Sequence, residues 1–425
     1  MLHKRSFRIV HHIAIVMSIV ALFTVFAALP ANAQYDYTVL HTFTGPPDGA
    51  FPSPLIQDSE GNLYGTTWEG GLGTCCGVVF KVDAAGNETV LYEFPGGNTG
   101  GYPVAGLVQD ASGNLYGTTQ GDSNFGLSVL FKLTPEGQET SWIAPSSVNW
   151  GSLNSPVTLD AQGNLYGMVP YGGTPNCGWE YNGLGCGTLF KMTPSGEFST
   201  IHTFTGTDGM YPQSGLVQDS KGNFYGAAVF GGISTCRAVG NGKDNDPGCG
   251  TIFKVDSTGN FSVLYTFTNK KDGSGPLGLI IDSEDNLYGI ATGGGNHDGN
   301  SYGYGTIFKL DTNTGSFKVL FTRTPNLSYP GAYYAPLLAR DSEGNLYGGQ
   351  ILGCAHGAGC LFKVDTKGKY TDLFDFQAYT GYPPENQDGF WIEGILLGSA
   401  GDFYGSMNLA GSATYGTVFH ITPTQ

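Results

Sequence analysis

Short apolar runs alternate with turn-forming residues along almost the whole chain. The runs, such as Leu55-Ile56 and Val78-Val79-Phe80, are almost continuously hydrophobic, which is typical of strands that are covered on both faces. Between them lie turns such as Ser59-Glu60-Gly61-Asn62, where Gly allows a positive φ and acidic side chains can bond the turn backbone. The pattern therefore predicts many short β-strands joined by tight hairpins.

The pattern is also an internal repeat. The block Gly61-Asn62-Leu63-Tyr64-Gly65 occurs seven times with small variations, and an apolar block with a central Phe follows each copy. The copies start at residues 61, 113, 163, 222, 285, 344 and 401, and the Phe residues are Phe80, Phe131, Phe190, Phe253, Phe308, Phe362 and Phe419. Four strand segments per repeat, named a to d from the axis outward, predict an all-β fold, the seven-bladed β-propeller with four antiparallel strands per blade.

The first and last strands are out of phase with the repeat. A d-type strand at 37–43 precedes the first a strand, whereas the last repeat ends after a c-type strand at 416–422. We therefore expect the N-terminal strand to complete the last blade by pairing with 416–422. This arrangement would close the ring and remove an exposed strand edge.

Residues 1–33 have the features of a signal peptide. Lys4, Arg5 and Arg8 precede an apolar stretch, and Ala31-Asn32-Ala33 matches a cleavage site. Cleavage after Ala33 would leave one β-propeller domain at 34–425, with no second apolar segment of membrane length; the alternative is an uncleaved membrane anchor. The sequence thus predicts an exported protein that is extracellular, periplasmic or at the cell surface, without membrane insertion after cleavage.

Composition and charge narrow the range of partners. Of the 425 residues, 68 are Gly and 22 are Pro, and only 13% are charged, a mixture that disfavours coiled coils and long helices. The net charge of −16 disfavours nucleic acid as a partner, because nucleic-acid binding needs a basic surface. We expect a monomer that binds a glycan or another envelope or extracellular protein.

The repeat unit resembles a known family. The unit Leu-Val-Gln-Asp-Ser-x-Gly-Asn-Leu-Tyr-Gly, followed by Gly-Thr-(Ile/Val)-Phe-Lys-(Val/Leu), resembles the GloVer tandem-repeat family of exported bacterial proteins over nearly all of 37–422. The last repeat departs from it at Gly398 and His420. The resemblance implies a secreted or surface protein and implies no particular activity. The shorter pattern Asp-x-x-Gly-Asn-Leu-Tyr is similar to NHL-type and lactonase-type propellers.

The long d–a and b–c loops lie on one face of the predicted propeller, opposite the tight a–b and c–d turns. Variable loops on a rigid scaffold often carry binding residues, and these loops combine aromatic residues with Asn, Asp and Gly. Aromatic rings can stack on the C–H faces of sugars, so carbohydrate is the candidate ligand. The candidate residues are Trp68, Trp150, Trp179, Trp391, Tyr333 and Tyr334. The alternative is that these rings attach the loops to the scaffold.

Four d–a loops contain an Asp-Gly pair at similar positions, and their acids are Asp48, Asp208, Asp272 and Asp388. If the four carboxylates gathered near the mouth of the central axis, they could hold a divalent cation. The alternative is that each Asp bonds its own loop backbone. No other cofactor is expected. His297 and His356, in b–c loops of adjacent blades, are the candidate acid–base or metal residues.

An Asp at the end of strand a accompanies a Lys in strand c in six blades. The pairs are Asp58 with Lys81, Asp110 with Lys132, Asp160 with Lys191, Asp219 with Lys254, Asp282 with Lys309 and Asp341 with Lys363. Two strand spacings separate a from c, a distance that a long Lys side chain can partly span. We expect each pair to form an ion bridge; the alternative is that the Asp only caps its turn.

All eight cysteines fall in b–c loops, and an exported protein favours their oxidation. Three loops contain two cysteines each, which predicts the disulfides Cys177–Cys186, Cys236–Cys249 and Cys354–Cys360. Cys75 and Cys76 are adjacent, so they either form a strained vicinal bond, which we favour, or remain two thiols.

These features favour a secreted binding or interaction protein over an enzyme. The chain has no G-x-S-x-G motif, phosphate loop or C-x-x-C pair. The alternatives are an extracellular hydrolase or lyase that acts on glycans or lactones, and a structural envelope protein without a ligand.

Overall fold

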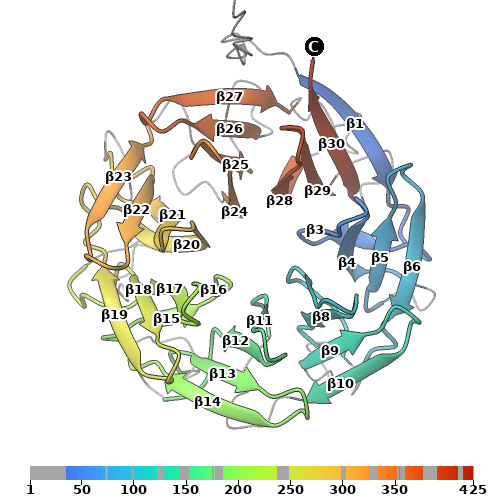
Figure 1. Ribbon diagram of the computed structural model, residues 1–425, viewed down its shortest axis with the longest axis horizontal. Helices are drawn as coiled ribbons and strands as arrows, with labels where there is room; N and C mark the ends of the chain where they lie inside the picture. Colours follow the sequence, from blue (N-terminus) through green and yellow to red (C-terminus); the bar gives the residue numbers. More distant parts are fainter. Residues whose placement is uncertain are drawn as a thin grey trace, which may run out of the picture. The chain divides into compact units, whose positions relative to one another are not determined.

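The seven repeats fold into seven sheets around one axis, each forming a blade (Figure 1). The computed structural model describes residues 35–71, 75–97, 100–121, 128–143, 153–174, 177, 185–236, 248–297, 303–324, 334–351, 354, 359–376, 390–409 and 415–424. The predicted all-β, seven-bladed propeller is confirmed, with antiparallel strands in every blade. Within these ranges, no helix is long and apolar enough to cross a bilayer. The predicted signal peptide lies outside them.

In blades 1 to 4 the strands follow one another outward from the axis. Blade 1 contains β2 (Ala50–Pro52), β3 (Ile56–Gln57), β4 (Leu63–Glu69), β5 (Val78–Val82) and β6 (Glu88–Glu93). Blade 2 contains β7 (Val108–Gln109), β8 (Leu115–Thr118), β9 (Val129–Leu133) and β10 (Glu139–Ile143). Blade 3 contains β11 (Thr158–Leu159), β12 (Leu165–Val169), β13 (Thr188–Met192) and β14 (Phe198–Thr203). Blade 4 contains β15 (Met210–Pro212), β16 (Val217–Gln218), β17 (Phe224–Phe230), β18 (Thr251–Val255) and β19 (Phe261–Thr266). In blades 1 and 4, strand a is split into two segments that both pair with strand b.

Blades 5 to 7 have the same order, except that the last blade takes its outer strand from the N-terminus. Blade 5 contains β20 (Ser274–Ile281), β21 (Asn286–Gly293), β22 (Thr306–Asp311) and β23 (Phe317–Thr322). Blade 6 contains β24 (Tyr334–Arg340), β25 (Leu346–Gln350), β26 (Cys360–Val364) and β27 (Tyr370–Asp375). Blade 7 contains β28 (Phe390–Leu397), β29 (Phe403–Leu409), β30 (Thr417–Pro423) and β1 (Tyr35–Thr42).

The ring closes through the pairing of β1 with β30. The two strands are antiparallel, with Tyr35 opposite Pro423 and Thr42 opposite Thr417. The predicted closure by the N-terminal strand is therefore confirmed. It leaves blade 7 with the same four strands as the other blades and covers the outer edge of β30.

The core of each blade is built on a contact between a Phe of strand c and a Gly of strand b. In blade 4, Gly226 lies directly opposite Phe253 in the antiparallel register. A Cβ added to Gly226 would lie 2.5 Å from Cζ of Phe253, which is too close for any side chain. The corresponding Phe has no exposed surface in any of the seven blades. The Tyr-Gly and Phe-Lys blocks therefore recur together, because the Phe ring fits only where the opposite residue is Gly.

Neighbouring blades are joined by a second ring at the end of strand d. In five places this Phe contacts the strand-c Phe of the next blade at 5.0–5.9 Å between ring centroids; the pairs are Phe43–Phe80, Phe94–Phe131, Phe204–Phe253, Phe267–Phe308 and Phe376–Phe419. Between blades 5 and 6, Arg323 takes this position. Its guanidinium lies 5.3 Å from the centroid of Phe362, and burial lowers the pKa of Arg323 to about 9. A cation–π contact thus replaces one ring pair.

The outer seam between blades 7 and 1 contains an unusual carboxyl group. Burial raises the pKa of Glu88, at the start of β6, to about 7, and the nearby negative charge of Asp48 adds to the effect. Oε1 of Glu88 is buried and accepts no hydrogen bond within the described part of the chain. The folded protein therefore disfavours the charged form of Glu88.

We expect Glu88→Gln to stabilise the protein at alkaline pH. Between the ordinary Glu pKa of 4.5 and the folded value of about 7, the folded state keeps a proton that the unfolded chain releases, so stability falls as the pH rises. Above this range the variant should be more stable than the natural protein by roughly 1–2 kcal/mol after solvent screening, with no difference below it. Urea unfolding at several pH values measures this.

Glu197→Gln is the matched control, because Glu197 is exposed just before strand d of blade 3. This control should change the unfolding midpoint little, because the side chain is exposed. Equal unfolding midpoints for Glu88→Gln and the natural protein at pH values above the folded pKa would show that the charged form of Glu88 does not destabilise the folded state.

Candidate functional site

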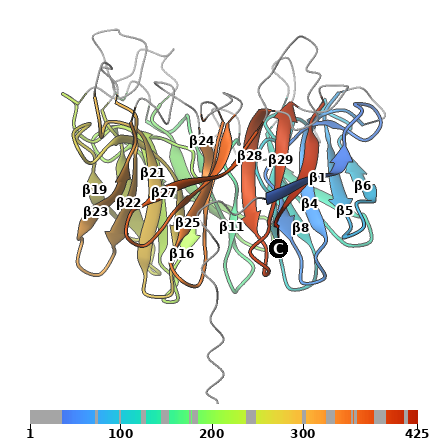
Figure 2. The same cartoon turned by 90° about the horizontal axis from the view of Figure 1, so that it is seen from above.

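The two ends of the blades differ in character. The a–b and c–d turns, such as 58–62 and 83–87, are tight and lie along the lower edge of the side view in Figure 2. The d–a and b–c connections lie at the opposite ends of the strands. We call these the tight-turn face and the long-loop face. Both faces contain residues that the sequence analysis proposes as candidates.

An aromatic cluster lies on the long-loop face, at the meeting point of blades 7, 1 and 2. Trp68, near the end of β4, lies 6.0 Å from Phe51 and 5.9 Å from Tyr102 between ring centroids. Phe51 also lies 6.4 Å from Tyr415. We call these four residues the aromatic cluster. Trp68 is 39% exposed, so part of the residue is accessible to a ligand.

The backbone holds two of these rings in a conformation that is rare for residues other than glycine. Phe51 has a φ of 61° and Tyr102 a φ of 58°, and Tyr211 repeats the feature in blade 4 with 59°. Their N–H groups donate to the carbonyls of Tyr415, Cys76 and Cys186 in the preceding blade, at 2.8–3.0 Å. Such positions cost of order 1–3 kcal/mol and persist where the surroundings impose them, commonly at functional sites.

Phe51, Tyr102 and Tyr211 are not among the residues predicted to bind a ligand, although the sequence contains a signal for them. Each residue starts an aromatic–Pro dipeptide: Phe51-Pro52, Tyr102-Pro103 and Tyr211-Pro212. The proline packs against a glycine of the preceding blade, as Pro212 does with Gly187. Tyr211 also lies 4.9 Å from Tyr171 and 6.0 Å from Phe230, in a second group of rings. Recurrent Phe-Pro and Tyr-Pro pairs would therefore have located the aromatic positions.

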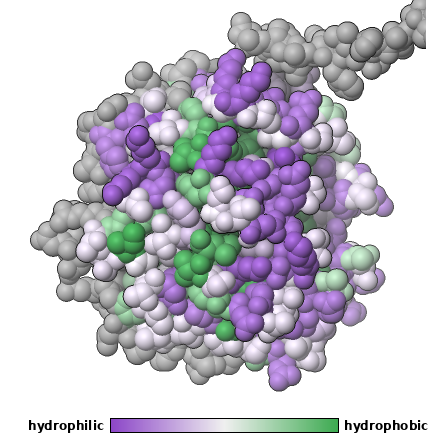
Figure 3. Space-filling view, turned by 60° about the vertical axis from the view of Figure 1, so that its left-hand side comes forward, coloured by the Kyte–Doolittle hydropathy of each residue, from purple (hydrophilic) through white to green (hydrophobic). Residues whose placement is uncertain are grey.

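Of the six residues predicted to bind a ligand, Trp68 is the one whose side chain the structure describes. In the view of Figure 3, hydrophobic residues form small patches among hydrophilic ones. The exposed large hydrophobic residues of the described chain are Trp68, Ile143, Ile233 and Val263. Trp391 lies on β28 and Tyr334 on β24, with side chains outside the description. Trp150, Trp179 and Tyr333 lie outside the described residues.

The predicted Asp positions cap their own loops. Asp48 accepts hydrogen bonds from the backbone and hydroxyl of Thr44, and Asp208 and Asp272 do the same with Thr205 and Thr268. Each also contacts a side chain of the outer strand d: His41, His202 or Tyr265. They therefore lie above the outer strands and not together at the axis; Asp388 is outside the described residues.

The described residues offer little support for a metal centre. The one group of three potential ligands within 4.8 Å of one another comprises Cys354, Cys360 and Asp372, and both of its cysteines are disulfide-bonded. Of the histidines considered for acid–base or metal chemistry, His297 contacts the carbonyl of Asn269 at 3.0 Å. His356 lies outside the described residues.

Four disulfides lie in or at the ends of the b–c loops and match the predicted pairing, with Cys360 the first residue of β26. They join Cys177 to Cys186, Cys236 to Cys249, Cys354 to Cys360, and the adjacent Cys75 to Cys76. Tyr102 donates its N–H to the carbonyl of Cys76, so the vicinal bond lies beside the aromatic cluster. The disulfides therefore constrain the loops of the long-loop face.

On the tight-turn face, each Asp that ends strand a organises its turn. In blade 4, Asp219 accepts hydrogen bonds from the backbone of Lys221 and Asn223, from the Asn223 amide and from the Tyr225 hydroxyl, at 2.7–2.9 Å. Burial alone would raise the pKa of Asp219, but these hydrogen bonds outweigh it and lower the pKa. Burial raises the pKa of Tyr225 to about 12, and its bond to Asp219 adds to the shift.

The predicted Asp–Lys bridges are wrong. No ion pair within 4.0 Å joins Asp219 to Lys254, or the members of any of the other five pairs, all of which are described. The lysine instead lies over the Tyr ring directly opposite it on strand b, at 5.4–5.7 Å in all six blades. The neighbouring ring holds the ammonium group, and the Asp acts as the turn cap.

Comparisons with known proteins agree with this architecture. A family model described as the Gloeobacter/Verrucomicrobia repeat matches residues 24–181 and 181–387. No curated protein matches the sequence.

Solved structures that resemble the chain are also propeller-containing proteins of low identity. One is the extracellular domain of a protein described as a one-component system from B. thetaiotaomicron, with a TM-score of 0.54, 11% identity and coverage of 91% of this chain and 40% of that chain. PorZ, a surface component of the type-IX secretion system of Porphyromonas gingivalis, has a TM-score of 0.52 and 14% identity, with coverage of 90% of this chain and 48% of that chain. An oligogalacturonate lyase from Vibrio parahaemolyticus has a TM-score of 0.55 and 10% identity, with coverage of 92% of this chain and 94% of that chain. The chain spans less than half of the first two, and these likenesses show the fold alone.

We expect Asp219→Ala to lower the free energy of unfolding by roughly 2–3 kcal/mol, because it leaves the buried Tyr225 hydroxyl and the turn donors unpaired. The pKa of Asp219 is lowered by folding, so this contribution is present above the ordinary Asp pKa of 3.8 and is lost as the pH falls through the folded value. Urea unfolding measures both. Lys254→Met should cost less than about 1 kcal/mol. Equal losses for the two variants would restore the ion-bridge interpretation.

We expect the intact mass of the purified protein to rise by eight hydrogens on reduction, two for each of the four disulfides. A rise of six would mean that Cys75 and Cys76 are free thiols. A cross-linked peptide that joins either of them to another blade would contradict the pairing.

Proposed function

This chain belongs to the Gloeobacter/Verrucomicrobia repeat family, and on that premise we propose that it is an exported propeller that binds carbohydrate on its long-loop face. The proposal is carried by one observation, the partly exposed Trp68 within the aromatic cluster. The four disulfides support export, because such bonds form and persist in oxidising compartments.

The chemistry of the cluster suits a sugar ring. The C–H face of a pyranose is apolar and can cover an indole ring, and the surrounding hydroxyls need polar partners. Glu69 follows Trp68 directly and lies opposite Ala50 in the register, and the N–H of Gln120 donates to the carbonyl of Tyr102. Two polar residues thus adjoin the aromatic cluster along the backbone. The left-handed backbone at Phe51 and Tyr102 keeps two rings in place before a ligand arrives, which reduces the entropy lost on binding.

The test is a glycan array with the purified protein, followed by titration of the best glycan. Trp68→Ala should weaken binding by about tenfold or more, as expected for an aromatic residue at the centre of a contact surface. Ile143→Ala is the control, because Ile143 is a large exposed hydrophobic residue on the outer strand of blade 2. It should leave the affinity unchanged.

Other outcomes separate the remaining functions. Cleavage of the bound glycan would identify a hydrolase or lyase. Binding that is insensitive to Trp68→Ala would move the site away from the aromatic cluster. Failure to bind any glycan would favour a protein partner or a structural role in the envelope.

A further inference from the structure

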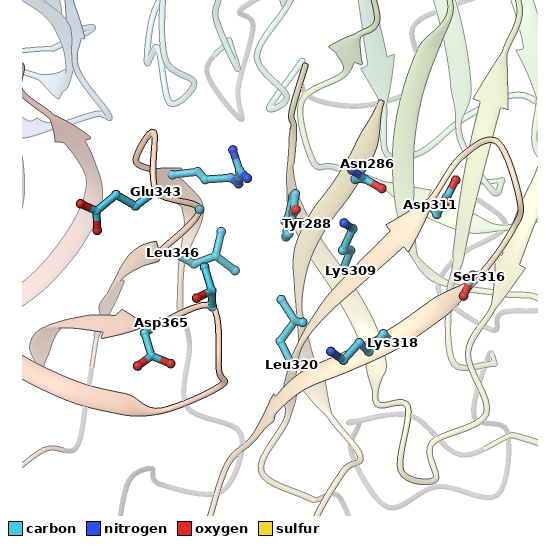
Figure 4. Close-up of a pocket in the computed structure, with 13 residues that line it drawn as sticks. Asn286, Tyr288, Lys309, Asp311, Ser316, Lys318, Leu320, Glu343, Leu346 and Asp365 are labelled. Carbon is cyan, nitrogen blue, oxygen red and sulfur yellow. The ribbon is translucent and has the colours of Figure 1, made fainter. Parts of the chain in front are cut away.

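A groove on the tight-turn face lies between blades 5 and 6 and encloses about 430 Å³. Lys309, Lys318 and Leu320 line it from blade 5, and Arg340, Glu343 and Asp365 from blade 6. Figure 4 shows Lys309 and Lys318 on one wall, with Glu343 and Asp365 on the wall opposite. Asp311 also lines the groove from blade 5, so three cations and three acids line it and each blade contributes groups of both signs.

Two of its cations are departures from the repeat. Lys318 lies directly opposite the repeated lysine, Lys309, and the same place is held by Thr38, Thr89, Thr140, Ser199, Ser262 and Thr371 in the other blades. The place of Arg340 at the end of strand a is held by Gln57, Gln109, Leu159, Gln218, Ile281 and Leu397. Both extra cations therefore occur in one groove of a chain whose net charge is −16.

The arrangement of the lysines is unfavourable without an anion. Like charges directly opposite each other on neighbouring strands repel. Within the described chain, neither Lys309 nor Lys318 has an acidic group within 4.0 Å. Arg340 is held near them by stacking on Tyr288 at 5.2 Å and by Asp282 at 3.8 Å, and its Nε is buried without a hydrogen-bond acceptor in the described chain. An anion in the groove would relieve this repulsion.

The equivalent groove between blades 1 and 2 provides a comparison within the same molecule. It encloses about 520 Å³ and has Lys81 as the equivalent of Lys309. Thr89 and Gln109 stand in place of the two extra cations. Three acids, Asp58, Glu60 and Asp110, also line it. Two similar cavities therefore differ in charge, which separates the effect of the cations from that of the fold.

We infer that the groove between blades 5 and 6 binds an anionic sugar derivative. The acidic group of the ligand lies among Lys309, Lys318 and Arg340, where charge-assisted hydrogen bonds are strongest. Sugar hydroxyls donate to Asp365 on the opposite wall, and Leu320 contacts the apolar part of the ring. The acidic group is a carboxylate or a phosphate. This site lies on the other face from the aromatic cluster and does not depend on the proposed carbohydrate site.

Isothermal titration of the purified protein with glucuronate, glucose 6-phosphate and glucose tests the inference. We expect saturable binding of at least one of the two anions, weakening as salt is added, and no binding of glucose here. The tighter anion identifies the source as a sugar acid or a sugar phosphate. Lys318→Thr, which restores the residue of the other blades, should raise the Kd by about tenfold, equivalent to about 1.4 kcal/mol.

The charge-matched control is the double variant Lys318→Thr with Thr89→Lys, which moves the cation to the groove between blades 1 and 2. It keeps the net charge of the natural protein and should bind the anion as weakly as Lys318→Thr alone. Recovery of the natural affinity in this variant would show non-specific attraction and overturn the inference. So would binding of neither anion, or equal affinity for glucose in the Trp68→Ala variant, in which the aromatic cluster is disrupted. A Trp68→Ala variant should bind the anion normally, which distinguishes this site from the aromatic cluster.

Discussion

The packing of a Phe ring onto a glycine is the contact on which every blade depends. Phe253 lies directly opposite Gly226, and any side chain at Gly226 would displace it. The same register places Lys254 opposite Tyr225, one position away. The lysine then covers the Tyr ring, and the Tyr hydroxyl reaches the Asp that caps the turn. One steric requirement in the core thus determines the polar arrangement on the tight-turn face.

The contact also connects the blades. The strand-c Phe receives the Phe at the end of strand d from the preceding blade, so the core of one blade continues into the next. Arg323 shows how strongly the position is constrained, since even a guanidinium there is buried and lies on Phe362. Closure by β1 completes the series, because Phe43 directly follows β1 and packs on Phe80 of blade 1. Blade 7 therefore has the same outer strand as the other blades, and the edge of β30 is covered.

The sequence was a good guide wherever the information was local or periodic. Strand phase predicted the closure of blade 7, and the cysteine pairs within single loops predicted three disulfides, with the Cys75–Cys76 bond the favoured one of two alternatives. It was a poor guide to side-chain direction. Lys81 and Asp58 were expected to meet across strand b, but Tyr64 lies between them and binds both. The Asp-Gly loops were placed at the axis, although Asp208 follows the outermost strand and contacts His202 on it.

The candidate sites were harder to predict because they lie at departures from the repeat, whereas self-comparison emphasises what the blades share. Residues required by the Phe–Gly contact are the same in every blade and cannot distinguish one ligand from another. Specificity must therefore come from positions that the contact leaves free. Trp68, near the long-loop end of strand b, is one such position, since the corresponding residues Gln120 and Val229 differ from it. Lys318 and Arg340, at strand positions that face the groove, are others. Because the scaffold repeats seven times, the residues that differ between blades distinguish the two faces. They are aromatic on the long-loop face at Trp68 and cationic on the tight-turn face at Lys318 and Arg340.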